Sequence, residues 1–502
     1  MESKDIDPRE PQDEHIVENR ELSIWEALIP VFALVAMLFY NVFYAFGDNA
    51  LSGSNQFILL LGAAVAAIVG AFNKVSYKQM LSEVAENVQS TTGAILILLM
   101  VGALAGTWLI SGIIPTMIYY GLQILNPTIF LASCVIICAI ISVATGSSWT
   151  TSATVGIALV LIAQALGISV GMTAGAVLSG AYFGDKLSPL SDTTNLAPAM
   201  AGTDLFTHIK YMTYTTVPTI IITLIVFIIL GFTATTSGDA DIANYSTLIS
   251  DNFKVTPWLL LVPVIVIGLI IIKTPPLIAL LAGTLLGVVA ALIFQPDLLL
   301  LVSEAENKIP SFTNYYKGAM NSITLETKLT SDNTFLSELY GGAGKGMAGM
   351  LETIWLIICA MVFGGVMDAI GALSRISKAL LSLFHTTFGL FASTVASCLA
   401  LNVTASDQYL AIVVPGKMYA KAYKDKGLAP ENLSRTLEDS GTVTSVLVPW
   451  NTCGAYQSGV LNVPVIDYFA FAIFNWLSPF MTLLFAAFRI KIRELSGRKA
   501  TA

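Results

Sequence analysis

The chain has 502 residues, of which 55% are hydrophobic and 12% charged, and its formal net charge is −8. A soluble domain carries about 25% charged residues, so this chain has too few polar side chains to face water over its whole surface. The composition therefore predicts a membrane protein in contact with a lipid bilayer, and the charge pattern gives no sign of nucleic-acid binding.

The first 24 residues are acidic and polar, which predicts a disordered cytoplasmic tail and not a signal peptide. Apolar stretches follow along the rest of the chain, and a helix that spans a bilayer needs about 20 such residues. Two less apolar stretches, 113–126 and 370–384, are expected along a membrane interface. The main apolar segments are 25–46, 57–72, 91–110, 128–143, 152–166, 174–200, 211–231, 257–272, 274–294, 350–367, 387–401, 404–420, 436–460 and 464–488.

Two distant parts of the chain resemble each other at a constant spacing. Gly112 aligns with Gly371, and the TGSS sequence at 145–148 aligns with TASD at 404–407. Both matches have an offset of 259 residues (371 − 112 and 404 − 145). Two matches far apart at one offset favour an internal repeat.

Basic charge differs between the equivalent loops of this repeat. The stretch 417–435 contains five Lys or Arg residues, whereas its counterpart 158–176 contains no charged residue. Loops rich in Lys and Arg face the cytoplasm, so the two copies are expected to have opposite orientations. The basic end of the chain is then cytoplasmic and the acidic loop 233–253 external. Inverted repeats of this kind are typical of secondary transporters.

These features predict an all-α polytopic membrane protein with two inverted-topology repeats, re-entrant hairpins and broken helices. The expected parts are a cytoplasmic tail at 1–24, N-terminal scaffold helices at 25–90, a first repeat at 91–231, inter-repeat helices and a polar loop at 232–344, a second repeat at 345–488 and a basic cytoplasmic tail at 489–502.

The most informative stretch is 179–198, which reads SGAYFGDKLSPLSDTTNLAP between apolar flanks. Pro189 cannot donate a backbone hydrogen bond and would interrupt a continuous helix. Non-helical backbone at membrane depth persists only where protein or a wet cavity satisfies its polar groups. The stretch therefore predicts a helix that is unwound at its centre and presents oxygen atoms to an ion.

Three further polar segments interrupt apolar runs. The second repeat has a comparable stretch at 438–454, and two hairpin tips lie at 145–151 and 402–408. Together with the first stretch they are expected to surround one cavity near the middle of the membrane. Carboxylate, hydroxyl, amide and carbonyl oxygens are the ligands that hard cations prefer, so the predicted cargo is a small cation.

The candidate ion- and proton-binding residues share oxygen-bearing side chains and positions in these four segments. They are Asp185, Ser191, Asp192, Thr193, Thr194, Asn195, Ser147, Ser148, Thr404, Ser406, Asp407, Asp439, Asn451 and Thr452. Asp185, Asp192 and Asn195 are the candidate ligands of Na⁺ itself. Burial disfavours the charged form of a carboxylate, so one such group can bind a proton and a cation in turn.

Other interpretations of the same residues remain open. Asp185 could pair with Lys186 or cap a half-helix, as the Asn and Thr candidates also could. Glu438 and Asp439 could simply end the basic loop at the membrane surface. His208 and His385 are expected in solvated positions near helix ends.

Residues 184–198, GDKLSPLSDTTNLAP, resemble the hallmark of the NhaC-type Na⁺/H⁺ antiporters, within the ion-transporter superfamily, and the similarity extends from about residue 20 to 490. This resemblance implies exchange of Na⁺, or of Li⁺ or K⁺, for H⁺ in a bacterial inner membrane, without a cofactor and in a homodimer. The family also includes antiporters of organic acids such as malate and lactate, which is the alternative function.

The scarcity of basic residues in the apolar segments favours a cation over an organic anion. A passive channel is a rival from another class, because it would carry ions without a coupling ion. An intramembrane enzyme is not expected, since no histidine lies in the four polar segments.

Overall fold

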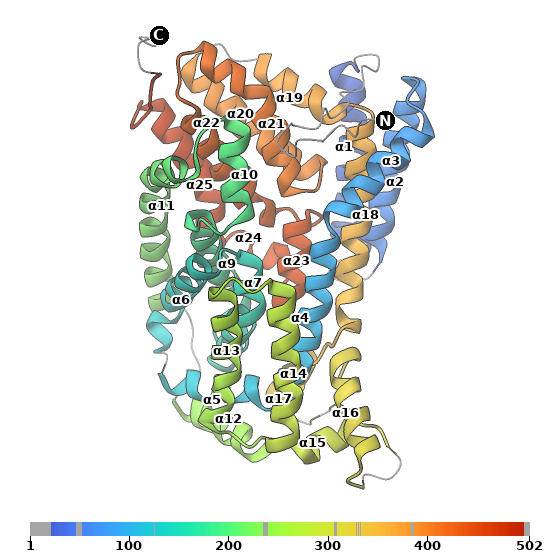
Figure 1. Ribbon diagram of the computed structural model, residues 1–502, viewed down its shortest axis with the longest axis vertical. Helices are drawn as coiled ribbons and strands as arrows, with labels where there is room; N and C mark the ends of the chain where they lie inside the picture. Colours follow the sequence, from blue (N-terminus) through green and yellow to red (C-terminus); the bar gives the residue numbers. More distant parts are fainter. Residues whose placement is uncertain are drawn as a thin grey trace, which may run out of the picture.

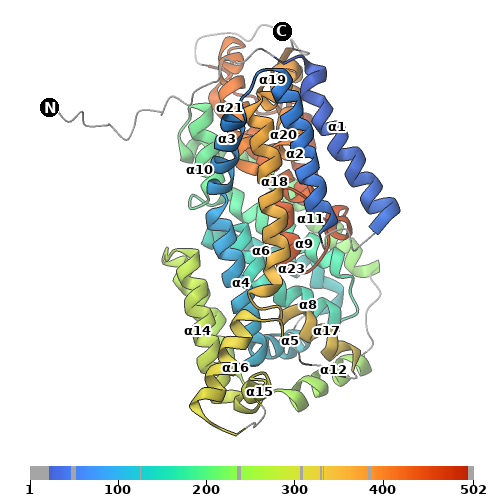
Figure 2. The same ribbon diagram turned by 90° about the vertical axis from the view of Figure 1, so that its right-hand side faces the viewer.

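The computed structural model describes residues 22–495 except 47–52, 125, 234–238, 306–308, 328, 330, 332 and 383–385. In this part of the chain the regular elements are helices, and the only bridge between extended residues joins Leu428 to Glu494. The molecule is elongated, and many of its helices run along its long axis (Figures 1 and 2). The tail expected at 1–24 falls almost wholly outside the described residues.

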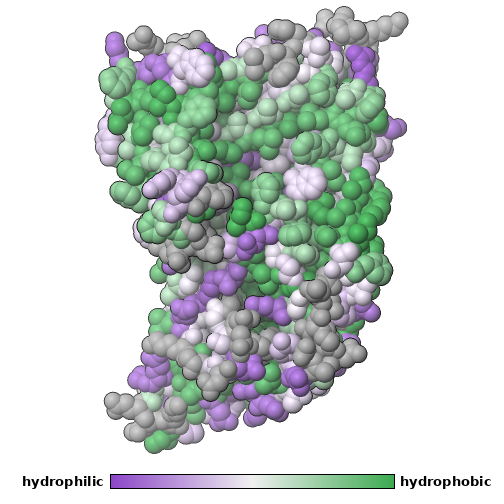
Figure 3. Space-filling view, turned by 180° about the vertical axis from the view of Figure 1, so that it is seen from behind, coloured by the Kyte–Doolittle hydropathy of each residue, from purple (hydrophilic) through white to green (hydrophobic). Residues whose placement is uncertain are grey.

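Within the described residues, nine helices are long and apolar enough to cross a membrane. A tenth crossing results if the bent pair 243–252 and 257–271, whose halves meet at 90°, is one span. Hydrophobic side chains cover most of the upper part of the back face, whereas hydrophilic ones gather toward its lower end (Figure 3). The prediction of an all-α polytopic membrane protein is therefore confirmed.

The first three helices form one side of the molecule: α1 (Ile24–Tyr40), α2 (Ser54–Phe72) and α3 (Tyr77–Ser90). Helix α1 begins at a capping box in which Ser23 Oγ accepts from the Glu26 amide and Glu26 accepts from the Ser23 amide. Helices α2 and α3 pack along α18 (Leu351–Ala369), and α1 packs on α2 (Figure 2).

The next part of the chain contains the first predicted break. Its helices are α4 (Thr92–Ile110), α5 (Ile113–Ile124), α6 (Phe130–Thr145), α7 (Ser148–Thr151), α8 (Ile157–Ala165), α9 (Val170–Leu187), α10 (Asp192–Ala201) and α11 (Leu205–Thr233). The apolar segment predicted at 174–200 is thus divided between α9 and α10, and the chain leaves helical geometry around Pro189, as predicted.

The middle of the chain is more helical than predicted. It forms α12 (Asp239–Asn252), α13 (Leu261–Ile271), α14 (Pro276–Phe294), α15 (Pro296–Leu301), α16 (Phe312–Thr324) and α17 (Thr334–Ala343). Helix α12 occupies most of the stretch 233–253, which the sequence predicts as an acidic external connection between membrane segments. Helix α16 packs on α4, where Gly102 and Gly106 approach the backbone of Gly346 and Ser322.

The last part contains α18 and then α19 (Ala372–Ser382), α20 (Thr387–Thr404), α21 (Gln408–Asp425), α22 (Pro430–Leu437), α23 (Thr452–Leu461), α24 (Val465–Phe469) and α25 (Ile473–Ala487). Arg435, which the charge pattern assigned to a basic loop, is instead in α22 and fully buried. A charge count along the sequence cannot show that a helix turns one basic side chain inward.

Helices α4 and α18 have matching lengths and surroundings. Each has 19 residues and is followed by a glycine in the left-handed region, Gly112 (φ 81°) and Gly371 (φ 74°). Helix α4 leads down to α5 at the lower end of the molecule, whereas α18 leads up to α19 at the upper end (Figures 1 and 2). Helices α10 and α23 also match, since each has 10 residues and a left-handed C-cap, Gly202 and Asn462.

Helix α9 is held against α6 by a close backbone contact. A Cβ atom added at Gly180 would lie 2.2 Å from the Val135 carbonyl oxygen, and one at Gly184 would lie 2.5 Å from the Ala139 carbonyl oxygen. Only glycine allows this separation, because any side chain would push the helices apart. The position of the first break therefore depends on the packing of α6 and α9.

We expect Gly180→Ala to lower the stability of the protein by about 1–3 kcal/mol through overpacking. Gly268→Ala in α13 is the matched control, because a Cβ atom there meets nothing within 4 Å. Thermal unfolding of the detergent-solubilised variants measures the difference. Equal melting temperatures for the two variants would contradict the close contact.

Candidate functional site

The break between α9 and α10 satisfies its own backbone with side chains. The Thr194 hydroxyl lies 3.2 Å from the carbonyl oxygen of Asp185 and 3.1 Å from that of Lys186, at the end of α9. Asn195 Nδ2 donates to the carbonyl oxygens of Pro189 and Ser191 at 3.0 and 2.7 Å. These contacts explain why the hydroxyl and amide residues follow the proline, since helix ends leave carbonyl groups without partners.

The second break has a different local geometry. Helix α22 continues into a π-helical turn at Glu438–Thr442, a short 3-10 helix follows at Ser445–Leu447, and α23 begins after its N-cap, Asn451. Asn402 Nδ2 donates to the Gly441 carbonyl oxygen at 2.8 Å and to the Thr444 hydroxyl at 3.0 Å. Such π-helical turns frequently occur at functional sites, because they widen the helix and expose backbone groups.

The first hairpin tip contacts the first break. Gly146 adopts a left-handed conformation (φ 71°), and Ser147 then caps α7 by accepting from the Thr150 amide at 3.1 Å. Asp185 Oδ2 accepts two hydrogen bonds from Ser148, one from its amide at 3.0 Å and one from its hydroxyl at 2.6 Å. The Asp185 carboxylate is therefore held at the N-terminal end of the helical segment that α7 begins.

The second hairpin tip contacts the second break in the same way. Ser406 has a left-handed backbone (φ 60°), and its carbonyl oxygen accepts from the Thr452 amide at 2.9 Å. Asp407 caps α21 by accepting from the amides of Tyr409 and Leu410, and its other oxygen lies 3.4 Å from the Thr452 hydroxyl. One carboxylate therefore joins each tip to its break. At the first tip this is Asp185, which belongs to the break, and at the second it is Asp407, which belongs to the tip.

The two breaks are joined by a buried ion pair. Lys186 Nζ donates to Asp439 Oδ1, and both side chains are fully buried. Asp439 Oδ2 also accepts hydrogen bonds from the hydroxyls of Thr215 in α11 and Thr482 in α25. A buried ion pair is stable only when further hydrogen bonds satisfy its remaining atoms, which these two threonines provide.

Two more contacts cross between the halves. Thr193 donates to Glu438 Oε1 at 3.1 Å, and Glu438 Oε2 has no hydrogen-bond partner in the described part of the chain. Trp149 stacks on Tyr456 with ring centroids 4.0 Å apart. We use the term junction for this meeting of the two broken segments at 185–193 and 438–452 with the tips at 145–148 and 404–407.

The junction holds more acidic than basic groups. Asp185 and Asp407 are 9% and 4% exposed, and Glu438 and Asp439 are fully buried. Lys186 forms its ion pair with Asp439, and both Lys186 and Asp185 lie close enough to Glu438 to interact with it electrostatically. Among the described residues no group of three or more His, Cys, Asp or Glu side chains is placed to hold a metal ion, so carbonyl and hydroxyl oxygens are the other available ligands.

The candidate Na⁺ ligands are not all in one place. Asp185 is buried in the junction, but Asp192 and Asn195 are exposed on α10. The Asn195 amide nitrogen already donates hydrogen bonds to carbonyl groups of the break. Asp192 interacts with Asp185 electrostatically. The remaining candidates lie at the tips, at the breaks or at the half-helix ends that adjoin them. They are Ser147, Ser148, Ser191, Thr193, Thr194, Thr404, Ser406, Asp407, Asp439, Asn451 and Thr452.

Several sequence-based interpretations were wrong. Lys186 pairs with Asp439 and not with Asp185, and Glu438 and Asp439 are buried instead of ending a loop at the surface. His208 is fully buried, with Nδ1 2.8 Å from the Ser434 hydroxyl, whereas a solvated position was expected. His385 lies outside the described residues.

Some residues of the junction were missed altogether. Thr215 and Thr482 belong to apolar helices distant in sequence from the four polar segments, and their only local signal is a nearby proline, Pro218 or Pro479, with neighbouring hydroxyl residues. Asn402 was within a predicted tip but was not selected, although an amide in an apolar run was a usable signal. The charge of Arg435 was noticed, but its burial depends on tertiary packing.

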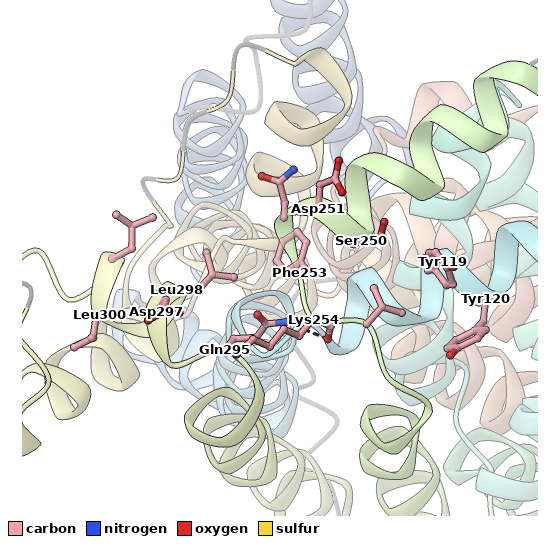
Figure 4. A pocket seen from close by; sticks show the side chains of 13 residues that line it. Tyr119, Tyr120, Ser250, Asp251, Phe253, Lys254, Gln295, Asp297, Leu298 and Leu300 are labelled. Carbon is pink, nitrogen blue, oxygen red and sulfur yellow. Dashed lines mark hydrogen bonds between the residues drawn. The ribbon is translucent and has the colours of Figure 1, made fainter.

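A separate cavity of about 760 Å³ opens at the lower end of the molecule, between α5, α12 and the start of α15 (Figure 4). Tyr119, Asp251 and Asp297 line it, and Gln295 Nε2 donates to the Lys254 carbonyl oxygen at 3.3 Å. None of its lining residues belongs to the junction, so this cavity is not the site of the buried carboxylates.

Known proteins resemble this chain over most of its length. The model of the Na⁺/H⁺ antiporter family matches residues 180–490. The Na⁺/H⁺ antiporter NhaC of Alkalihalophilus pseudofirmus is 36% identical over 427 residues, which cover 85% of this chain and 88% of that protein. The NhaC protein of Bacillus subtilis is 33% identical over 430 residues, covering 85% of this chain and 90% of its own.

A further relative has a different name. The malate-2H⁺/Na⁺-lactate antiporter of Bacillus subtilis is 35% identical over 429 residues, which cover 84% of this chain and 86% of that protein. The region that the family model matches includes both breaks and the second tip, and the identity to each of the three relatives is above 30% over more than four fifths of its length. The chain therefore belongs to the Na⁺/H⁺ antiporter family.

Proposed function

We propose that this protein is a secondary active transporter, not an enzyme, that exchanges Na⁺ for H⁺ across a bacterial cytoplasmic membrane, with Li⁺ or K⁺ as alternatives to Na⁺. The observation that carries the proposal is the excess of buried carboxylates at the junction, where two broken helices meet. Ionisable groups inside membrane segments are costly and commonly mark ion pathways. The names of the relatives support the same exchange.

Charge balance provides the physical reason for exchange. With Asp439 neutralised by Lys186, the carboxylates of Asp185, Asp407 and Glu438 cannot all remain ionised in a medium of low dielectric. Either protons or a cation must neutralise them. Because both cargoes neutralise the same groups, binding of one disfavours binding of the other, and this competition couples their movements.

Asp185 and Glu438 are the best-placed pair for this competition. A path of hydroxyls connects them, since Ser191 interacts with Asp185, Ser191 Oγ is 3.2 Å from Thr193 Oγ1, and Thr193 donates to Glu438. The hydroxyls, together with the carbonyl groups of the breaks, supply the kind of oxygens that Na⁺ requires. Displacement of Lys186 from Asp439 would add a further carboxylate when the cation binds.

We infer that access alternates by movement of the breaks and tips relative to the scaffold helices. The equal lengths and opposite directions of α4 and α18 support an inverted repeat, which is the usual basis of alternating access. The same arrangement predicts that both termini are cytoplasmic. The proposal includes a homodimer, which mass measurement of the solubilised protein would test.

Exchange of an organic acid is the second candidate, and one observation favours it. Arg435 is fully buried, and none of its three side-chain nitrogens has a hydrogen-bond partner in the described part of the chain. A buried guanidinium can receive a carboxylate, and the malate and lactate antiporter is among the relatives. Saturable uptake of labelled malate or lactate into proteoliposomes, together with an absence of Na⁺/H⁺ exchange, would favour this function.

We expect wild-type proteoliposomes to dissipate an imposed pH gradient when Na⁺ is added, as reported by a pH-sensitive dye. Asp185→Asn should slow this exchange by at least about tenfold, equivalent to about 1.4 kcal/mol, because it removes a buried charge that the cation requires. Asp192→Asn is the matched control, since the same change at an exposed carboxylate of the same segment should have a smaller effect. Equal activity of wild type and Asp185→Asn would refute the role of Asp185.

The ion pair at the junction predicts a specific pattern of stability. Lys186→Met should destabilise the protein by about 3–5 kcal/mol, because Asp439 remains buried without its counter-ion. The double variant Lys186→Met/Asp439→Asn should recover most of that loss while failing to exchange ions. Thermal unfolding and the dye assay measure the two effects, and a wild-type melting temperature for Lys186→Met would show that the pair does not stabilise the junction.

The orientation can be measured independently of transport. A fluorescent protein that matures only in the cytoplasm, fused to the C-terminus, is expected to fluoresce, because the basic end of the chain remains on the cytoplasmic side. A dark fusion that is nevertheless inserted in the membrane would reverse the proposed orientation of both repeats.

A further inference from the structure

A second cavity, of about 450 Å³, lies where α11 begins and where the chain continues beyond α25. Lys210, Lys491 and Arg493 line it, together with Thr207, Tyr211 and Tyr214. It is separate from the junction, because no junction carboxylate lines it. We refer to it as the basic pocket.

Positive charge prevails in the basic pocket. Lys210 and Lys491 are exposed, and within the described part of the chain Arg493 alone of the three has an acidic partner, since its Nη1 lies 2.7 Å from Glu431 Oε1. Asp204 is a nearby acid, and its carboxylate accepts from the Thr207 amide at 2.9 Å. An anion that entered the pocket would meet lysine side chains whose charges these acids only partly offset.

Tyr211 forms the inner wall of the pocket and separates it from a buried cation. The guanidinium of Arg435 lies 4.5 Å from the centroid of the Tyr211 ring and 5.8 Å from that of Phe485. Its three nitrogens have no hydrogen-bond partner among the described residues. Arg435 thus carries a positive charge on the inner side of the Tyr211 ring, without a hydrogen-bonded partner in the described part of the chain. In a low-dielectric surrounding this charge adds to the positive potential of the pocket.

The pocket also borders a surface built for lipid. From the start of α11 onward, apolar side chains point outward, with Phe206 72%, Val217 41% and Ile221 50% exposed. Tyr214 is 38% exposed at the pocket itself, and Lys491 Nζ lies 5.1 Å from the centroid of its ring. Tyrosines and basic residues at the end of a membrane helix are typical of the boundary between acyl chains and headgroups.

We propose that the basic pocket binds the headgroup phosphate of an anionic phospholipid, whose acyl chains lie along the outward face of α11. Lysine ammonium groups and the hydroxyls of Thr207 and Tyr214 would hold the phosphate. The adjoining apolar face favours a lipid over free phosphate, because free phosphate gains nothing from such a surface.

Binding at this pocket would reach the junction through α22. The Tyr211 hydroxyl donates to Asn432 Oδ1 at 2.6 Å and accepts from the Arg493 amide at 3.2 Å. Asn432 and Asp439 belong to one continuous helical segment, made of α22 and the π-helical turn that follows it. A lipid that restricts the movement of Tyr211 therefore also restricts the movement of the helical segment that carries Asp439. Lipid binding itself does not depend on the proposed exchange, so its test stands if the function is different.

The test compares two charge-matched double variants of the full-length protein. Lys210→Gln/Lys491→Gln alters the pocket, and Lys421→Gln/Lys424→Gln removes the same charge from exposed positions on α21. Each protein is titrated in detergent with phosphatidylglycerol, with phosphatidylcholine and with inorganic phosphate. Thermal unfolding reports stabilisation, and native mass spectrometry reports the bound lipid.

We expect phosphatidylglycerol, but neither phosphatidylcholine nor phosphate, to raise the melting temperature of the wild type and of the α21 control. The pocket variant should bind phosphatidylglycerol about thirtyfold more weakly, since each lysine near an anionic lipid contributes about 1 kcal/mol. Equal stabilisation by inorganic phosphate would overturn the proposal in favour of a simple phosphate site. Unchanged lipid binding by the pocket variant, or equal loss in the control, would also overturn it.

Discussion

Lys186 and Asp439 come from different broken helices and meet where neither side chain is exposed to solvent. The energetic cost of removing two charges from water is offset here by their mutual attraction and by the hydroxyls of Thr215 and Thr482. Because those threonines belong to α11 and α25, one ion pair draws four separate helices together. The position of each break relative to the other follows from this contact.

The same constraint applies to the neighbouring carboxylates, but they are satisfied differently. Asp185 accepts from the amide and hydroxyl of Ser148, and Asp407 accepts from two amides at the start of α21. Helix N-termini stabilise negative charge in this way without supplying a counter-ion. The carboxylates are therefore held in place while remaining available to a proton or a cation, as an exchanger requires.

Breaks in the helices make this arrangement possible. Unwinding at Pro189 frees the Asp185 and Lys186 carbonyls, and the Thr194 hydroxyl satisfies them. The widened turn at Glu438–Thr442 similarly leaves the Gly441 carbonyl to Asn402. Each break thus depends on polar side chains that a continuous membrane helix would not tolerate. The cost of those side chains in an apolar setting explains why they are concentrated in four short segments.

The membrane spans, the break at Pro189 and the polar tips were predictable from the sequence, because hydrophobic runs, proline and clustered hydroxyls act locally. The family was predictable for the same reason, since residues 184–198 carry it as a contiguous motif. The tertiary structure alone decided that Lys186 meets Asp439, that Arg435 and His208 are buried, and that Asp192 and Asn195 are exposed. Partners 253 residues apart leave no local signal. Which face of a helix turns inward depends on the packing of its neighbours, and that packing is a property of the whole fold.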